Sequence, residues 1–273
     1  MEVKEDPQFD KYFSLLASKI ASLDKAIDYS KLSDAMERWE IQRDYFAQFY
    51  PEIEKVIPMW TWLNTQLNGR ICFHTLRMLY CTLNDKNYLL LSPEKQNVIK
   101  WTIILHDIAK RNVPTFKEDK KDPAHPYNSA IVALDVFNSL SEYKETFSQA
   151  KIKLLQEKIK ASIIDDYIPD LKELGNILEQ AKDIFVSSHF CYLVFKLIIM
   201  HQALPYFNTA DQPVYLTDEE IKKYCDVEFL QLMKIIATND LINYHLQNSI
   251  IRQSLCDAIE ELYIKYFKLI SPS

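Results

Sequence analysis

Glycine is almost absent from this chain, with Gly69 and Gly175 the only two among 273 residues. At the usual frequency of about 7%, a chain of this length would carry roughly 19. Phosphate-binding loops of the P-loop and Rossmann types need closely spaced glycines, as does the nucleophile elbow of α/β-hydrolases, so the sequence excludes all three. Tight β-hairpins also rely on glycine for residues with positive φ. We therefore expect an all-α fold.

Charge and hydropathy argue against several classes of partner. The net charge is −6 and the isoelectric point is near 5.6, whereas dedicated nucleic-acid binders are usually basic. No run of about 18 uncharged apolar residues occurs, so the sequence predicts no contact with the membrane interior. The first residues, MEVKEDPQFDKYF, lack the apolar core of a signal peptide. We expect a cytoplasmic protein without nucleic-acid or membrane partners.

The pattern of cysteines is also typical of a cytoplasmic protein. They are odd in number, widely spread and include no C-x-x-C pair, which is typical of reduced thiols and not of a disulfide or zinc framework. The five are Cys72, Cys81, Cys191, Cys225 and Cys256.

Apolar residues recur every three or four positions along most of the chain, which predicts helices throughout. The expected helices cover 8–28, 30–50, 52–67, 70–84, 93–110, 126–140, 143–161, 170–182, 184–203, 217–224, 226–246 and 249–269. Two proline-containing segments, 111–125 and 204–216, interrupt this pattern, and each lies directly beside a histidine. Long irregular segments inside helical domains are often functional, so the histidines beside these two segments are candidates for a functional site.

The sequence ILHDIAK (104–110) places His106 and Asp107 within an apolar run. A buried carboxylate is costly unless it is paired or bound to a metal ion. Adjacent residues of a helix point about 100° apart, so both can hold one ion only where the helix bends or ends. The polar residues and proline that follow predict that the helix ends within one turn of the pair.

Four motifs in this order resemble the HD-domain superfamily of metal-dependent phosphohydrolases: FHTLRMLY (73–80), LHDIAK (105–110), AHPYNSA (124–130) and ATNDLINY (237–244). The resemblance covers about residues 67–250. It implies a single-domain helical bundle in which 67–273 form the core with a C-terminal helix. The resemblance does not explain residues 1–66, which we expect to form a helical extension packed on this core. The family often has glycine where Ala109 stands, which is a mild departure.

The resemblance also implies a set of metal ligands. It assigns one ion to His74, His106, Asp107 and Asp240, and it places His125 and His201 where a second ion would bind, with Asp107 as the bridge. Imidazoles with one or two carboxylates suit Mn²⁺, Fe²⁺, Co²⁺, Ni²⁺ or Zn²⁺, with Mg²⁺ a further candidate. For His125 and His201 the alternative is a hydrogen-bonded core residue beside a single ion.

Two basic residues are candidates for contacting a phosphate. Lys110 follows His106 by four positions and Asp107 by three, so it would share their helix face, but it could equally be a solvated last-turn lysine. Arg77 follows His74 by one turn and could instead pair with a carboxylate.

The remaining histidines are weaker candidates. His189 precedes His201 by 12 residues and would face another direction on a helix, and we expect His245 to be structural. Four aromatic residues could line a base or sugar pocket but are more typical of a core: Tyr127, Tyr206, Phe207 and Tyr244.

Together these features predict a metal-dependent phosphatase or phosphodiesterase. Its substrate would be a nucleotide or similar small phosphoester, attacked by metal-bound hydroxide, with Asp107, Lys110 and Arg77 in the catalytic machinery. One alternative is a diiron oxygenase of the same fold. Another is a non-enzymatic helical binding module with a vestigial metal site. A homodimer is compatible with the sequence, and the role of residues 1–66 stays open.

Overall fold

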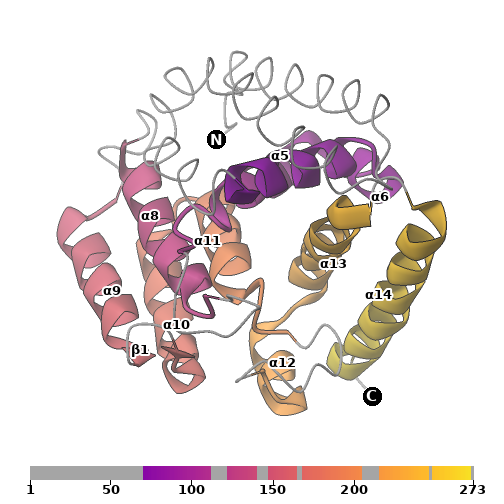
Figure 1. The fold of residues 1–273 in the computed structure, drawn as a ribbon. Coiled ribbons are helices and arrows are strands. Elements are labelled where there is room, and N and C mark those ends of the chain that lie inside the picture. The colour runs from indigo at the N-terminus through magenta and orange to yellow at the C-terminus, as the bar shows by residue number, and fades with distance from the viewer. Residues whose placement is uncertain are drawn as a thin grey trace, which may run out of the picture.

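A computed structural model describes residues 70–111, 122–139, 147–164, 168–204, 215–245 and 248–271. Within these residues the chain is all-α, as predicted, apart from one antiparallel pair of two-residue strands (Figure 1). No helix in the described ranges combines the length and the hydropathy that crossing a bilayer requires. The helices expected over 8–28, 30–50 and 52–67, and with them the proposed N-terminal extension, lie outside the described residues.

The elements follow one another in a simple order. They are α5 (Arg70–Leu83), α6 (Lys86–Leu89), α7 (Pro93–Leu105), α8 (His125–Ser139), α9 (Gln149–Ala161), β1 (Ile163–Ile164), β2 (Ile168–Pro169), the 3₁₀ helix η2 (Leu171–Glu173), α10 (Leu174–Ile184), α11 (His189–Met200), α12 (Asp218–Tyr224), α13 (Val227–Ile242), the 3₁₀ helix η3 (Asn243–His245) and α14 (Ser249–Ile270).

Side-chain caps explain where several helices begin. Ser92 accepts a hydrogen bond from the backbone N–H of Lys95, and proline occupies the first position of α7. Thr217 and Glu220 form a reciprocal capping box at α12, and Asp226 caps α13 through the N–H of Phe229. Such caps satisfy N–H groups that have no partner inside the helix.

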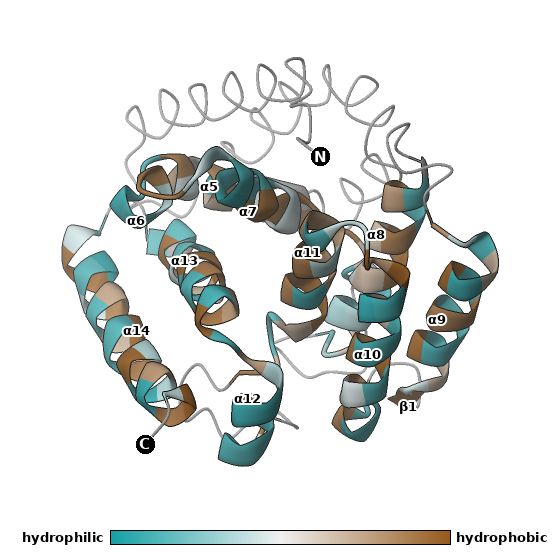
Figure 2. Cartoon of the chain, turned by 180° about the vertical axis from the view of Figure 1, so that it is seen from behind, coloured by the Kyte–Doolittle hydropathy of each residue, from teal (hydrophilic) through white to brown (hydrophobic). Residues whose placement is uncertain are grey.

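Two helices form the centre of the described bundle. Residues 97–105 of α7 and 193–200 of α11 are continuously buried, because mainly apolar residues lie on every side of both helices. The two helices pack on each other, α8 covers α11, and α5 and α13 pack on α7. Figure 2 shows the contrast between the mainly hydrophobic α11 and the mainly hydrophilic α12. The outer helix α14 packs on α13 and buries only Ile259, Tyr263 and Tyr266 fully.

Several predicted boundaries were wrong. The helix expected over 93–110 ends at Leu105, and residues 106–109 form turns. The helix expected over 184–203 begins only at His189 and ends at Met200, and 170–182 divides into η2 and α10. The sequence analysis also missed α6 and the β1–β2 pair, which are too short to produce a periodic signal. Cys81, Cys191 and Cys225 are buried free thiols, as expected for reduced cysteines.

Candidate metal centre

The His106–Asp107 pair lies where α7 stops. His106 is the C-terminal cap of the helix, and its Nδ1 lies 2.7 Å from the carbonyl oxygen of Ile103. The backbone N–H of Ala109 donates to Ser129 Oγ of α8 at 3.2 Å, which fixes the following turn against that helix. The end of the helix therefore allows two adjacent side chains to face the same point, as the sequence required.

Two further histidines are held in the same way. His201 caps the C-terminus of α11, and its Nδ1 lies 2.7 Å from the carbonyl oxygen of Ile198. His125 opens α8, and its Nδ1 contacts the carbonyl oxygen of Asp122. Carbonyl groups in the last turn of a helix lack the usual N–H partner four residues later, which makes them available to the imidazoles. The carbonyl of Ile198 also accepts the backbone N–H of His201.

These contacts determine which ring nitrogen faces the centre. A carbonyl oxygen can only accept a hydrogen bond, so Nδ1 must carry the hydrogen, and in the neutral ring Nε2 presents a lone pair. His125 Nε2 and His201 Nε2 are 2.9 Å apart, a repulsive contact between two lone pairs unless a cation lies against both. Two nitrogens bound to one ion at about 2.0–2.1 Å would be separated by about 2.9–3.4 Å. The observed spacing fits a shared cation.

Asp107 stands at the middle of the cluster. Its Oδ1 lies 2.8 Å from His125 Nε2 and 3.8 Å from His201 Nε2. Its Oδ2 lies 3.7 Å from Nε2 of both His74 and His106, and 2.7 Å from Lys110 Nζ. Each carboxylate oxygen therefore faces a different pair of imidazoles, which is the arrangement of a bridging ligand.

Two buried atoms in this cluster lack a hydrogen bond among the described residues: His106 Nε2 and Asp107 Oδ1. Buried polar atoms are nearly always paired, and an ion would satisfy both atoms.

The fourth imidazole comes from α5. His74 Nε2 lies 2.9 Å from Asp240 Oδ1, on the last turns of α13, and His74 Nδ1 lies 3.1 Å from Asn243 Oδ1. The Asp240 side chain is 29% exposed, whereas His74 is 6% exposed and Asp107 only 2%. Solvent thus reaches the cluster beside Asp240.

Burial and charge act in opposite directions on the ionisable groups. Burial lowers the pKa of His106, and it lowers that of His201 further, with the neighbouring imidazoles of His125 and His106 adding to the effect. Burial alone would raise the pKa of Asp107, but Lys110 and the adjacent histidines hold it well below its ordinary value. The pKa of Asp240 is about 2, because His74 and His106 outweigh the opposing effect of burial.

The described residues thus contain two buried groups that could hold an ion, and Asp107 belongs to both. One group is His74, His106 and Asp107, and the other is Asp107, His125 and His201. In each group the possible ligand atoms lie within 4.8 Å of one another. Two neutral imidazoles and a carboxylate are a donor set that suits divalent transition metals.

The structure brings together all six predicted ligands, from α5, α8 and α13 and from the turns that follow α7 and α11. Lys110 joins them through its ion pair with Asp107. Arg77 is half-buried on α5, one turn after His74, and its contact with a phosphate stays a prediction. His189 is exposed and pairs with Glu228, and His245 lies in η3. Tyr127 is buried in the core, Tyr206 and Phe207 lie outside the described residues, and the side chain of Tyr244 is not described.

Three residues around the centre were not assigned from the sequence. Ser129 belongs to a motif that was quoted, although its bond to Ala109 was not foreseen. Asp122 supplies the carbonyl for His125, and its buried Oδ2 accepts hydrogen bonds from the backbone N–H and the Nε–H of Arg111 at 3.1 and 3.2 Å. Asn243 contacts a histidine 169 positions away, and no local pattern signals such a contact.

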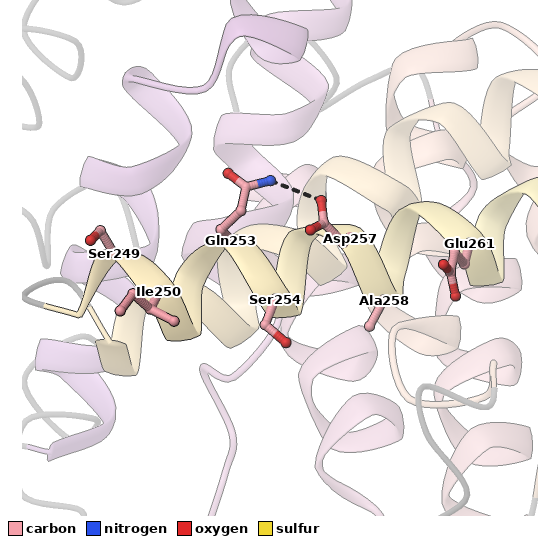
Figure 3. A pocket seen from close by; sticks show the side chains of 7 residues that line it. All are labelled: Ser249, Ile250, Gln253, Ser254, Asp257, Ala258 and Glu261. Carbon is pink, nitrogen blue, oxygen red and sulfur yellow. Dashed lines mark hydrogen bonds between the residues drawn. The ribbon is translucent and has the colours of Figure 1, made fainter.

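A second feature lies apart from these residues. One face of α14 borders a hollow of about 660 Å³ (Figure 3). Gln253 donates a hydrogen bond to Asp257 there, at 2.8 Å. The described lining residues come from α14 alone and include no histidine or cysteine: Ser249, Ile250, Gln253, Ser254, Asp257, Ala258 and Glu261.

No protein-family model, curated protein or solved structure matches this chain significantly. The protein has an all-α fold with a buried histidine–aspartate cluster that could bind metal ions.

Proposed function

We propose that this protein is a metal-dependent phosphohydrolase of the HD type that acts on a small phosphoester such as a nucleotide. The observation that carries the proposal is the pair of buried histidine–carboxylate groups sharing Asp107, with Lys110 against the same carboxylate. The order and identity of these residues resemble the HD pattern.

Each side chain has a definite task in this proposal. His74, His106, Asp107 and Asp240 would hold one divalent ion, and Asp107, His125 and His201 would hold a second. Such ions supply an activated water molecule near neutral pH and neutralise charge on a phosphoryl oxygen. The backbone carbonyls behind His106, His125 and His201 keep their Nε2 atoms directed inward before any ion arrives.

The charge of the centre favours an anionic substrate. Four neutral imidazoles contribute no charge, Asp107 and Asp240 contribute two negative charges, and Lys110 contributes one positive charge. With two divalent cations the cluster would carry a net charge of about +3 at a largely buried site, and a phosphoester dianion would offset two of these charges. Lys110, 23% exposed at its side chain, can reach such a group while it still contacts Asp107.

Metal analysis combined with a substrate screen tests the proposal. We expect protein purified without chelator to contain up to two divalent ions per chain and to hydrolyse an aryl phosphate or a nucleotide. Asp107→Asn should abolish both properties, while His189→Ala, an exposed histidine outside the cluster, should change neither. Metal binding without hydrolysis of any phosphoester would contradict the proposal. Bound iron that absorbs visible light and consumes O₂ would favour the oxygenase alternative.

A further inference from the structure

One of the four imidazoles is held differently from the other three. His106, His125 and His201 each use the carbonyl three residues earlier in the chain. His74 lies inside α5, where the corresponding carbonyl, that of Ile71, already accepts a hydrogen bond from Thr75 Oγ1. The ring of His74 therefore needs a partner from elsewhere in the fold, and Asn243 Oδ1 provides it at 3.1 Å.

The network around Asn243 fixes which end of its amide faces the histidine. Its Nδ2 donates to the carbonyl oxygen of Asn239 at 3.2 Å and also to that of Asp240. A reversed amide would place Oδ1 against these two carbonyl oxygens and Nδ2 against the ring. The unreversed amide donates to both carbonyl oxygens, so its Oδ1 faces His74. Because this oxygen can only accept a hydrogen bond, Nδ1 of His74 must carry the hydrogen.

Asn243 also opposes a competing interaction. His74 Nε2 lies 2.9 Å from Asp240 Oδ1, so a carboxylate is available to hold a hydrogen on the nitrogen that should bind the ion. When an ion occupies the site, the one remaining ring hydrogen must be on Nδ1. The fully buried amide of Asn243 provides a fixed acceptor for it there.

We infer that Asn243 is a positioning residue that holds Nδ1–H of His74 and thereby directs Nε2 at the metal ion. This inference rests on the proposed metal centre, but not on the reaction that the centre performs. Asn243 has a second task, because its Nδ2 satisfies carbonyl groups at the C-terminal end of α13. An experiment must separate these two roles.

Three variants separate them. Asn243→Asp keeps an acceptor for His74 but loses both donations to the end of α13. Asn243→Ala loses both roles. Asn239→Ala is the matched control, since Asn239 is a fully buried asparagine one turn earlier whose side-chain Nδ2 donates to Asp85 and to the carbonyl oxygen of Ile235.

The measurements are the Zn²⁺ dissociation constant and the ¹H–¹⁵N spectrum of the Zn²⁺-loaded protein with labelled histidine. We expect the wild type to show a slowly exchanging Nδ1–H for His74. Asn243→Ala should lose this signal and bind Zn²⁺ about 10–100-fold more weakly, the usual effect of removing a partner of a metal-bound histidine. Asn243→Asp should keep the signal and most of the affinity, although its melting temperature falls as in Asn243→Ala.

Three outcomes would overturn the inference. The first is an equal loss of affinity in Asn243→Asp and Asn243→Ala, and the second is an equal loss in Asn239→Ala. The third is a wild-type protein that binds no Zn²⁺, which would also remove the proposed function. A protein that binds Zn²⁺ and shows the expected differences between variants, but hydrolyses no phosphoester, supports the inference and refutes the proposed function alone.

Discussion

The two sides of the metal centre are built by different means. On the α8–α11 side, His125 and His201 are oriented by backbone carbonyls close to them in the chain. On the α5–α13 side, His74 is oriented by the side chain of Asn243, which reaches it only when two distant helices pack together. On the first side both imidazoles are oriented by contacts that are local in the chain. The second side combines one such contact, at His106, with a contact at His74 that depends on tertiary structure.

The two sides also differ in their exposure to solvent. The side chains of His125 and His201 are 1% and 3% exposed, but that of Asp240 is 29% exposed. We therefore expect an ion on the α5–α13 side to exchange faster and to meet the substrate first. The other ion would be bound more deeply.

Removing Asp107 should have the largest effect, because this residue belongs to both sides. We expect Asp107→Ala to lose both ions and to reduce any hydrolytic activity by more than about 100-fold, since the imidazoles then face one another without a bridging charge. Elemental analysis and circular dichroism measure the metal content and the fold. A variant that retained both ions would show that the carboxylate is structural.

Removing one imidazole from either side should abolish binding of the ion on that side and leave the other ion bound. We expect His201→Ala to retain one ion, held by His74, His106, Asp107 and Asp240, and His74→Ala to retain the ion on the α8–α11 side. Titration with Co²⁺ would show one equivalent in each variant and two in the wild type. A stoichiometry of one in the wild type that neither substitution changes would leave a mononuclear centre, with His125 and His201 as hydrogen-bonded core residues.

The buried histidines should make the metal-free protein sensitive to mild acid. Burial lowers the pKa of His106 and His201 below 6.5, so as the pH falls below 6.5 the unfolded chain binds protons that the folded protein does not. Stability is present above that pH and is lost below it, by at most about 1.4 kcal/mol per pH unit for each histidine. The carboxylates contribute separately, because the lowered pKa values of Asp107 and Asp240 matter only below 3.8.

Urea unfolding at a series of pH values checks this dependence. His201→Phe should weaken it below pH 6.5, above the range in which the carboxylates titrate. If the free energy of unfolding of His201→Phe depended on pH as steeply as that of the wild type, groups other than His201 would be responsible.

The smallest effect concerns the turn that carries the shared carboxylate. Ser129→Ala would leave the backbone N–H of Ala109 buried without its acceptor, which should lower the free energy of unfolding by about 1–3 kcal/mol. Ser129→Thr, which keeps the hydroxyl group, is the control. Equal stability of the alanine variant and the wild type would show that the turn does not depend on α8.

The sequence was informative about helices and about the identity of the clustered histidines. Periodicity predicted the central helices, but it extended the helix of His106 to residue 110, because Ile108 and Ala109 continue the apolar pattern after the helix has ended. The motifs selected His74, His125 and His201, which the structure brings to one place. They could not select Asn243 or Asp122. Asn243 acts through a side-chain oxygen beside His74, and Asp122 acts through a backbone carbonyl beside His125. Only the folded structure shows that these groups lie beside the rings.

The hydrogen bonds between Arg111 and Asp122 have a consequence for engineering this protein. They join the two residues that flank the stretch 112–121 and so hold its two ends close together. Doubling the length of a connection costs only about 0.6 kcal/mol in chain entropy. A peptide epitope or a fluorescent reporter inserted within 112–121 should therefore leave Lys110 and His125 in place.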